Sequence, residues 1–139
     1  MIRNDNEVAL LKATATKGSQ SPSDLAEVVG SNRTYTLMSH ALTVGASRKF
    51  TGVDVAGQVT EYVSDLKNRY PAVDILKPSV AEALLRAALG EPERLEGINP
   101  NDAGALLFFL AHVLLVDQQL DDAQVESFVD QVLRLASSV

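Results

Sequence analysis

The sequence predicts an all-α fold, a compact single domain of about six or seven helices around a central apolar helix near residues 100–116. Three observations predict this fold. Helix-capping residues recur along the chain, apolar residues repeat at spacings of three and four, and strand patterns are nearly absent. The alternating stretch at residues 72–76 is short and lies between two prolines. A chain of 139 residues can bury about two-thirds of its unfolded surface, which suffices for one domain over residues 1–139.

The N-terminal part of the chain carries two clear helix starts. Ser21 precedes Pro22 and an acid, which is the order typical of a helix N-terminus. Thr51 and Asp54 resemble a capping box for a long amphipathic helix. Residues 45–50 between these elements are expected to be a loop, and the seam of the domain if it has lobes. The helices expected here span residues 5–16, 22–29, 32–44 and 52–69.

The C-terminal part carries further helix boundaries. Ser79 and Glu82 form a capping-box pattern, and Gly90 stands where a glycine commonly ends a helix. Asp121 and Gln124 form a second capping box, followed by an apolar stripe along the last helix. The helices expected here span residues 79–89, 100–116 and 122–136, with a short turn near residues 92–95.

The helix near residues 100–116 is apolar on every side, which is typical of a helix that crosses a core. Its apolar run, residues 103–116, is shorter than the roughly 20 residues that span a bilayer, so the sequence favours a core helix over a membrane anchor. We interpret His112 as a neutral core histidine that is hydrogen-bonded to a carbonyl or a neighbouring side chain, the alternative being a ligand or base. The side chains expected to be buried are Leu107, Leu110, Val113 and Leu114.

Composition limits the partners. The formal net charge is −6, and residues 71–139 hold four of the bases and eleven of the acids. Such a surface repels nucleic acid and anionic membranes and suits a basic partner. The chain has no cysteine and no recognisable signal peptide, so we expect a cytoplasmic protein without disulfides.

Four acids form the predicted partner-binding site. Asp122, Glu126 and Asp130 stand four residues apart on one edge of the last helix, and Asp117 precedes them. Like charges at this spacing repel by roughly 0.2–0.5 kcal/mol per pair. Their presence therefore has two explanations, a solvated acidic face or a docking surface for a basic protein.

The loop before this helix also resembles a metal-binding loop. Residues 117–124 are similar to the Asp-Gly-x-Ile-Asp-x-x-Glu loop of tellurite-resistance TerB-like helical domains, which also joins an apolar helix to an amphipathic one. Gln118 replaces the glycine and Gln124 replaces the glutamate, so a carboxylate ligand is lost. The pattern of an EF-hand is absent as well. The sequence therefore predicts no metal site and no cofactor.

A second hypothesis is a DNA-binding helix-turn-helix formed by residues 22–44. Gly30 would make the turn, and the next helix would bury Tyr35, Met38, Ala41 and Leu42. Its opposite face would read the major groove. Residues 1–50 hold six bases and four acids, a weak positive charge for a DNA-binding surface. The residues predicted to contact nucleic acid are Arg33, Thr36, Ser39 and His40.

Enzyme signatures are absent from the sequence. We find no phosphate-binding loop, no dinucleotide fingerprint, no zinc-protease motif and no nucleophile elbow. General acid–base work by Asp or Glu needs a pocket that the sequence does not reveal. The sequence therefore favours a non-catalytic protein-interaction domain, such as an adaptor, an inhibitor or an immunity-type protein, with the helix-turn-helix as the alternative.

Overall fold

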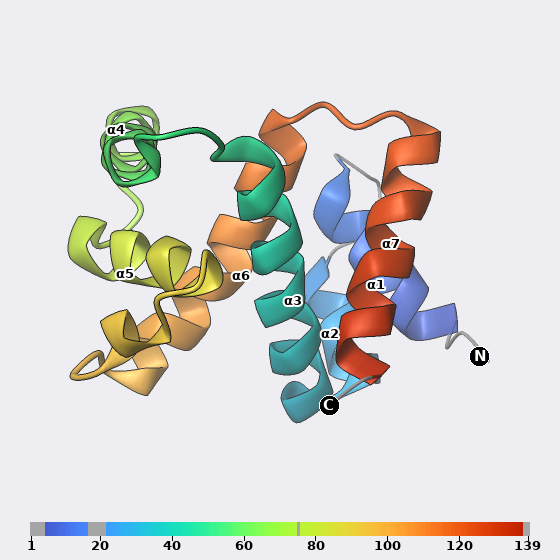
Figure 1. Ribbon diagram of the computed structural model, residues 1–139. Coiled ribbons are helices and arrows are strands. Elements are labelled where there is room, and N and C mark those ends of the chain that lie inside the picture. Colours follow the sequence, from blue (N-terminus) through green and yellow to red (C-terminus); the bar gives the residue numbers. More distant parts are fainter. Residues whose placement is uncertain (1–4, 17–21, 75, 138–139) are drawn as a thin grey trace.

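The computed structural model describes residues 5–16, 22–74 and 76–137. These residues form seven α-helices and one short 3₁₀ helix, with no strand among them, so the all-α prediction is confirmed. In chain order they are α1 (Asp5–Ala15), α2 (Pro22–Val29), α3 (Ser31–Lys49), α4 (Val55–Arg69), α5 (Pro78–Ala88), η1 (Pro92–Leu95), α6 (Pro100–Asp117) and α7 (Asp122–Ser137) (Figure 1).

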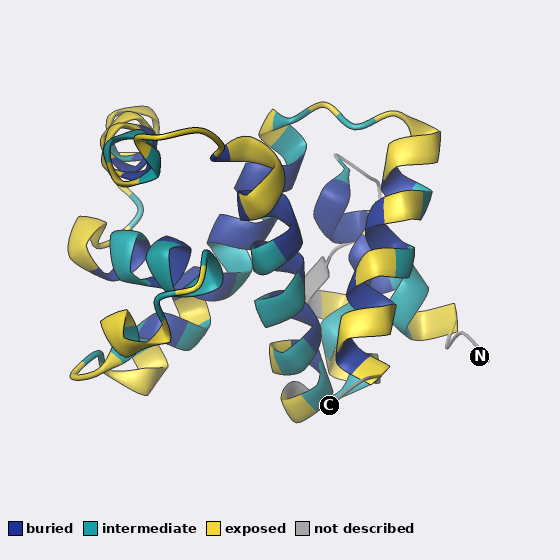
Figure 2. Ribbon diagram, viewed as in Figure 1, coloured by how far each residue is buried: buried dark blue, intermediate teal, exposed yellow. Residues whose placement is uncertain are grey.

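Two helices, α3 and α6, form the centre of the molecule. α6 packs against α1, α3 and α5, while α3 packs against α2, α5, α6 and α7. Figure 1 shows α4, α5 and η1 on one side of this pair and α1, α2 and α7 on the other. Buried residues follow α3, α6 and the inner face of α7, whereas the outer faces of α4 and α7 are exposed (Figure 2). The predicted central helix is therefore central, and it shares that position with α3.

Gly45 permits the close approach of the two central helices. A Cβ atom at this position would lie 3.2 Å from Leu115 Cδ2 and 3.3 Å from Leu114 Cδ2. Such distances are shorter than ordinary van der Waals contact, so a larger residue would push the helices apart. Gly45 lies near the C-terminal end of α3, and its two leucine neighbours lie near the C-terminal end of α6. The two helices are thus in close contact at these ends.

The burial of α6 agrees with its sequence. Leu107, Leu110, Val113 and Leu114 are all buried, as predicted. The helix is 18 residues long, and it is the one helix in the described ranges whose length and apolarity would suffice to cross a membrane. The length of α6 therefore does not by itself distinguish a core helix from a membrane-spanning helix. Burial of eight α6 side chains against neighbouring helices is what makes it a core helix here.

Several predicted helix boundaries are confirmed. Asp121 Oδ1 accepts from the Gln124 backbone N–H at 2.8 Å, and Gln124 Oε1 accepts from the Asp121 N–H at 2.9 Å, which completes the capping box of α7. The Asn99 side chain caps α6 by accepting from the N–H of Asn101. Gly90 follows α5 with φ of 110°, a conformation that favours glycine.

Three predicted boundaries are wrong. Residues 45–49 are not a loop but the last turns of α3, because buried Gly45 and Ala46 keep the helix in contact with the core. Asp54, rather than Thr51, is the N-cap of α4, where its side chain accepts from the N–H of Gly57. Ser79 does not cap α5, because the helix begins one residue earlier, at Pro78.

Truncation of Leu110 tests the burial of α6. This side chain is fully buried, so Leu110→Ala should lower the free energy of unfolding by about 2–5 kcal/mol, the range for large-to-small changes in cores. Urea denaturation of the two proteins measures the difference. A loss below about 1 kcal/mol would mean that α6 packs less closely than described.

The two glycines within the central helices make a matched pair for testing their approach. Gly45→Leu should destabilise the protein by about 1–3 kcal/mol, because the new side chain meets Leu114 and Leu115. Gly104→Leu in α6 should leave stability unchanged or raise it by up to about 1 kcal/mol, since a Cβ there meets no atom within 4 Å and leucine is the better helix former. Equal stability of the two variants would contradict the close contact at Gly45.

Candidate functional site

The four acids of the predicted partner-binding site do not form one surface. Asp117 ends α6, and its carboxylate is bound by residues of α4. Asp122 is exposed in the first turn of α7. Glu126 pairs with Lys12 of α1, with 2.7 Å between Nζ and Oε1, and Asp130 is half-buried. The docking surface on α7 therefore stays a prediction, carried by fewer exposed carboxylates than the sequence suggested.

Asp117 is the centre of a polar cluster that joins α4 to α6. The Tyr62 hydroxyl donates to Asp117 Oδ2 at 3.0 Å, and Arg69 Nη2 donates to the same oxygen at 2.6 Å. Lys49 at the end of α3 places its ammonium 5.2 Å from the centre of the Tyr62 ring. Next along the chain, Gln118 Nε2 donates to the Gly45 carbonyl at 3.0 Å. The cluster thus fixes the ends of three helices relative to one another.

The electrostatics of this cluster favour a structural role. Burial tends to raise the pKa of Asp117, but the hydrogen bonds from Arg69 and Tyr62 outweigh it, and the pKa lies below the ordinary 3.8. Burial and the neighbouring carboxylate raise the pKa of Tyr62. A general acid or base works best with a pKa near the operating pH, and both groups are shifted away from it. The cluster therefore holds helices together without suiting proton transfer.

His112 has the partner that the core interpretation predicted. Its Nδ1 donates to the Thr14 carbonyl of α1 at 2.9 Å, with the ring half-buried. The Thr14 hydroxyl is fully buried and donates to the Leu10 carbonyl at 2.8 Å. The contact joins α6 to α1, which accounts for a polar side chain on an apolar helix.

The residues predicted to contact DNA are held within the fold. α2 and α3 are separated by Gly30 alone, whereas a helix-turn-helix uses a turn of three or four residues. Arg33 donates from Nε and Nη2 to the two carboxylate oxygens of Glu7 in α1, each at 2.9 Å, which raises the pKa of Arg33. Burial and the charge of Arg33 lower the pKa of His40. Thr36, Ser39 and His40 are half-buried, so this arrangement adds no support for DNA binding.

One open hollow lies between α2 and the N-terminal halves of α3 and α6. It has a volume of about 330 Å³ and mainly apolar walls. Tyr35 is 52% exposed at its edge, and Gly104 leaves space in it that a side chain could fill. The wall residues are Ala26, Glu27, Thr34, Tyr35, Met38, Gly104, Leu107 and Phe108.

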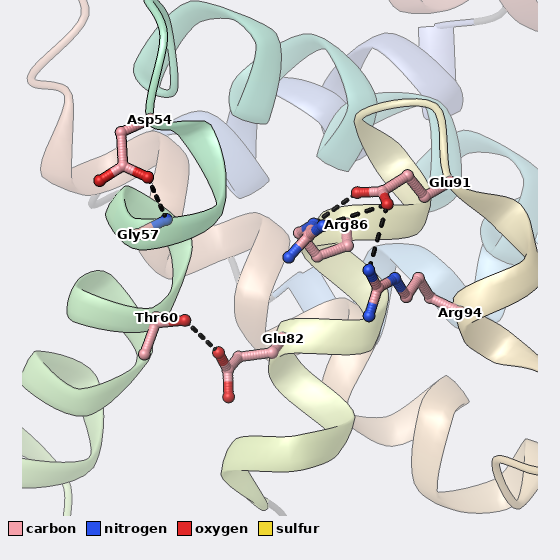
Figure 3. Close-up of polar contacts among 7 residues, drawn as sticks. All are labelled: Asp54, Gly57, Thr60, Glu82, Arg86, Glu91 and Arg94. Atoms are coloured by element: carbon pink, nitrogen blue, oxygen red, sulfur yellow. Dashed lines mark hydrogen bonds and ion pairs between the residues drawn. The ribbon is translucent and has the colours of Figure 1, made fainter.

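A smaller hollow of about 160 Å³ adjoins the first, because Tyr35 and Leu107 line both. Its far wall is η1, where Pro92 and Leu95 face α5 and α3. Figure 3 shows how this wall is held, with the carboxylate of Glu91 bonded to Arg86 of α5 and to Arg94 of η1. Its other wall residues are Ser39, Leu42, Thr43, Leu84, Ala87 and Ala88. We call the two hollows together the groove.

The sequence did not indicate the groove, and Tyr35 explains why. Its spacing with Met38 and Ala41 predicted a buried side chain, yet it is half exposed, so that prediction is wrong. Leu37 and Met38 of α3 are buried, whereas Tyr35 lies beside the short helix α2, none of whose described side chains is fully buried. An apolar stripe predicts which face of a helix is buried. It does not predict how far along the helix the neighbouring elements cover that face.

Comparison with known proteins gives no identity. No model of a protein family matches the chain, and no characterised protein or solved structure matches it either. Within the described ranges, no three histidine or acidic side chains are grouped so that they could hold a metal ion. The groove is therefore the candidate site on geometry alone.

The pKa shift of Asp117 makes a prediction about acid stability. Because the native pKa is lowered, the charged cluster stabilises the fold above the unfolded pKa, and this contribution is lost as the pH falls through the native value. Asp117→Asn should destabilise the protein by about 1 kcal/mol at neutral pH, and the difference should shrink below about pH 4. Urea denaturation across this pH range measures both effects.

Asp65→Asn is the matched control for this experiment, since Asp65 pairs with the same Arg69 at 3.3 Å but is 62% exposed. We expect it to change stability by less than about 0.5 kcal/mol at any pH. A pH-independent loss in Asp117→Asn would contradict the role of the charged carboxylate.

Proposed function

We propose that this chain is a non-catalytic protein-interaction domain, of the adaptor, inhibitor or immunity type, and that the groove holds its partner. The observation that carries the proposal is the half-exposed Tyr35 between two adjoining apolar hollows. Tyrosine is enriched among residues that dominate binding energies, because it offers a large contact area at low entropic cost. Contiguous apolar surface with a polar rim is typical of interaction sites.

The chemistry of the walls supports binding rather than catalysis. Among the described residues that line the two hollows, Glu27 is the one carboxylate, and none is a histidine, lysine or arginine. General acid–base catalysis needs a positioned proton donor or acceptor within reach of substrate, usually tuned by a neighbour. The groove offers shape and apolar area instead, which are the features that a docking surface requires.

Gly104→Leu tests the proposed site, because Gly104 lines the larger hollow and a Cβ atom there meets no protein atom within 4 Å, so the new side chain would extend into the hollow. Immobilised wild-type chain and the variant would each be exposed to a lysate of the source cell, and the captured proteins compared by mass spectrometry. We expect a partner that the wild type captures and Gly104→Leu loses. The exposed neighbour Ala105, changed to leucine, is the matched control and should retain it.

Two results would contradict the groove as the site. The first is capture of the same partner by wild type and Gly104→Leu. The second is loss of the partner in Glu126→Gln with retention in Gly104→Leu, which would place the docking surface on α7, as the sequence analysis predicted.

A further inference from the structure

Three basic side chains of the described residues near the groove, Arg33, Arg86 and Arg94, are engaged in ion pairs. Arg33 of α3 is bound by Glu7 through two hydrogen bonds of 2.9 Å. At the other end, Arg86 of α5 and Arg94 of η1 share the carboxylate of Glu91 (Figure 3). These guanidinium groups therefore present little free positive charge to a ligand in the groove.

By contrast, four acidic side chains near the two ends of the groove are exposed and are not engaged in ion pairs within the described residues. Glu27 lines the larger hollow, and Asp24 stands one turn before it on α2. Glu93 and Glu96 flank Leu95, which lines the smaller hollow. All four are exposed, and their carboxylates form no hydrogen bond or ion pair within the described part of the chain. An apolar floor thus lies between two ends that carry net negative charge.

This charge pattern discriminates between possible occupants. A second copy packed symmetrically on the same groove would bring Asp24 and Glu27 against equivalent acids, which is unfavourable. An anionic membrane would be repelled for the same reason. The walls are helices whose backbone groups are bonded internally, so an extended strand would find no edge to pair with. An amphipathic helix can instead insert apolar side chains into both hollows from one face.

We infer that the groove binds a basic amphipathic helix of a partner protein, with apolar anchors on either side of Tyr35 and lysine or arginine residues opposite the acids of α2 and η1. This inference rests on the proposed function and specifies the chemistry of the partner. The acids steer the helix by charge, and the apolar walls retain it.

The inference is tested with three synthetic helical peptides that share one leucine face, at spacings of three and four, and differ in the polar face. That face carries lysine in the first, glutamine in the second and glutamate in the third. Binding to the full chain is measured by fluorescence anisotropy. We expect the lysine peptide to bind at least about tenfold more tightly than the glutamate peptide at low salt, with the glutamine peptide between them and the differences narrowing as salt is raised.

Two pairs of variants locate the binding. Gly104→Leu should weaken the binding of all three peptides at least about tenfold, whereas Ala105→Leu should leave their binding unchanged. Tyr35→Ala is a second variant at the groove, exposed enough to leave the core intact. Glu27→Lys should reduce the preference for the lysine peptide several-fold, while Glu61→Lys, which makes the same charge change at an exposed site on α4, should preserve it. Circular dichroism confirms that each variant is folded.

The outcomes separate this inference from the proposed function. Equal binding of the three peptides, lost in Gly104→Leu, would overturn the basic partner and leave the groove as a docking site. If the lysine peptide still binds to both Gly104→Leu and Tyr35→Ala, its binding site lies outside the groove. This result would overturn the inference and also the groove as the docking site. Absence of binding by any peptide would also overturn both.

Discussion

The close contact of α3 with α6 at Gly45 is the constraint on which the rest of the structure depends. A residue without a side chain allows Leu114 and Leu115 to pack against the backbone of α3. α1, α2, α5 and α7 pack on one or both of these two helices. α4 and η1 pack on α5, and α4 also reaches α6 through the Asp117 cluster. Tight packing of this kind gives a domain of small aliphatic side chains a dense core with few aromatic residues.

The groove is a consequence of the same packing. α3 and α6 are held together near their C-terminal ends, while the larger hollow lies between their N-terminal halves. The eight-residue helix α2 borders the larger hollow and the short 3₁₀ helix η1 borders the smaller one, and Tyr35, which lines both, stays 52% exposed. The Arg33–Glu7 and Arg86–Glu91 pairs hold the surrounding helices in place. A rigid frame around an uncovered apolar surface favours binding, because little ordering is required when a partner docks.

The net charge of a segment does not show which of its carboxylates are paired in the structure. The C-terminal half holds most of the excess acid, yet Asp117, Glu91 and Glu126 are engaged by Arg69, Arg86 and Lys12. Two of the acids beside the groove, Asp24 and Glu27, come from the half of the chain that is nearly neutral. Interactions between exposed charges are screened beyond about a Debye length. The ion pairs that form in the folded chain therefore decide which carboxylates are left to attract a charged partner.

The sequence by itself determined most of the helices, the capping box of α7, and the burial of Leu107, Leu110, Val113 and Leu114, because caps and periodic burial depend on residues within one or two turns. It also indicated that His112 would be hydrogen-bonded within the fold, to a carbonyl or to a neighbouring side chain. Only the tertiary structure decided that this carbonyl belongs to Thr14, that Arg33 pairs with Glu7, that α3 continues to Lys49, and that Tyr35 stays uncovered. These features join residues from different helices or depend on where a neighbouring helix ends. The helix propensity of a segment does not determine such contacts, because they are set by the packing of the whole core.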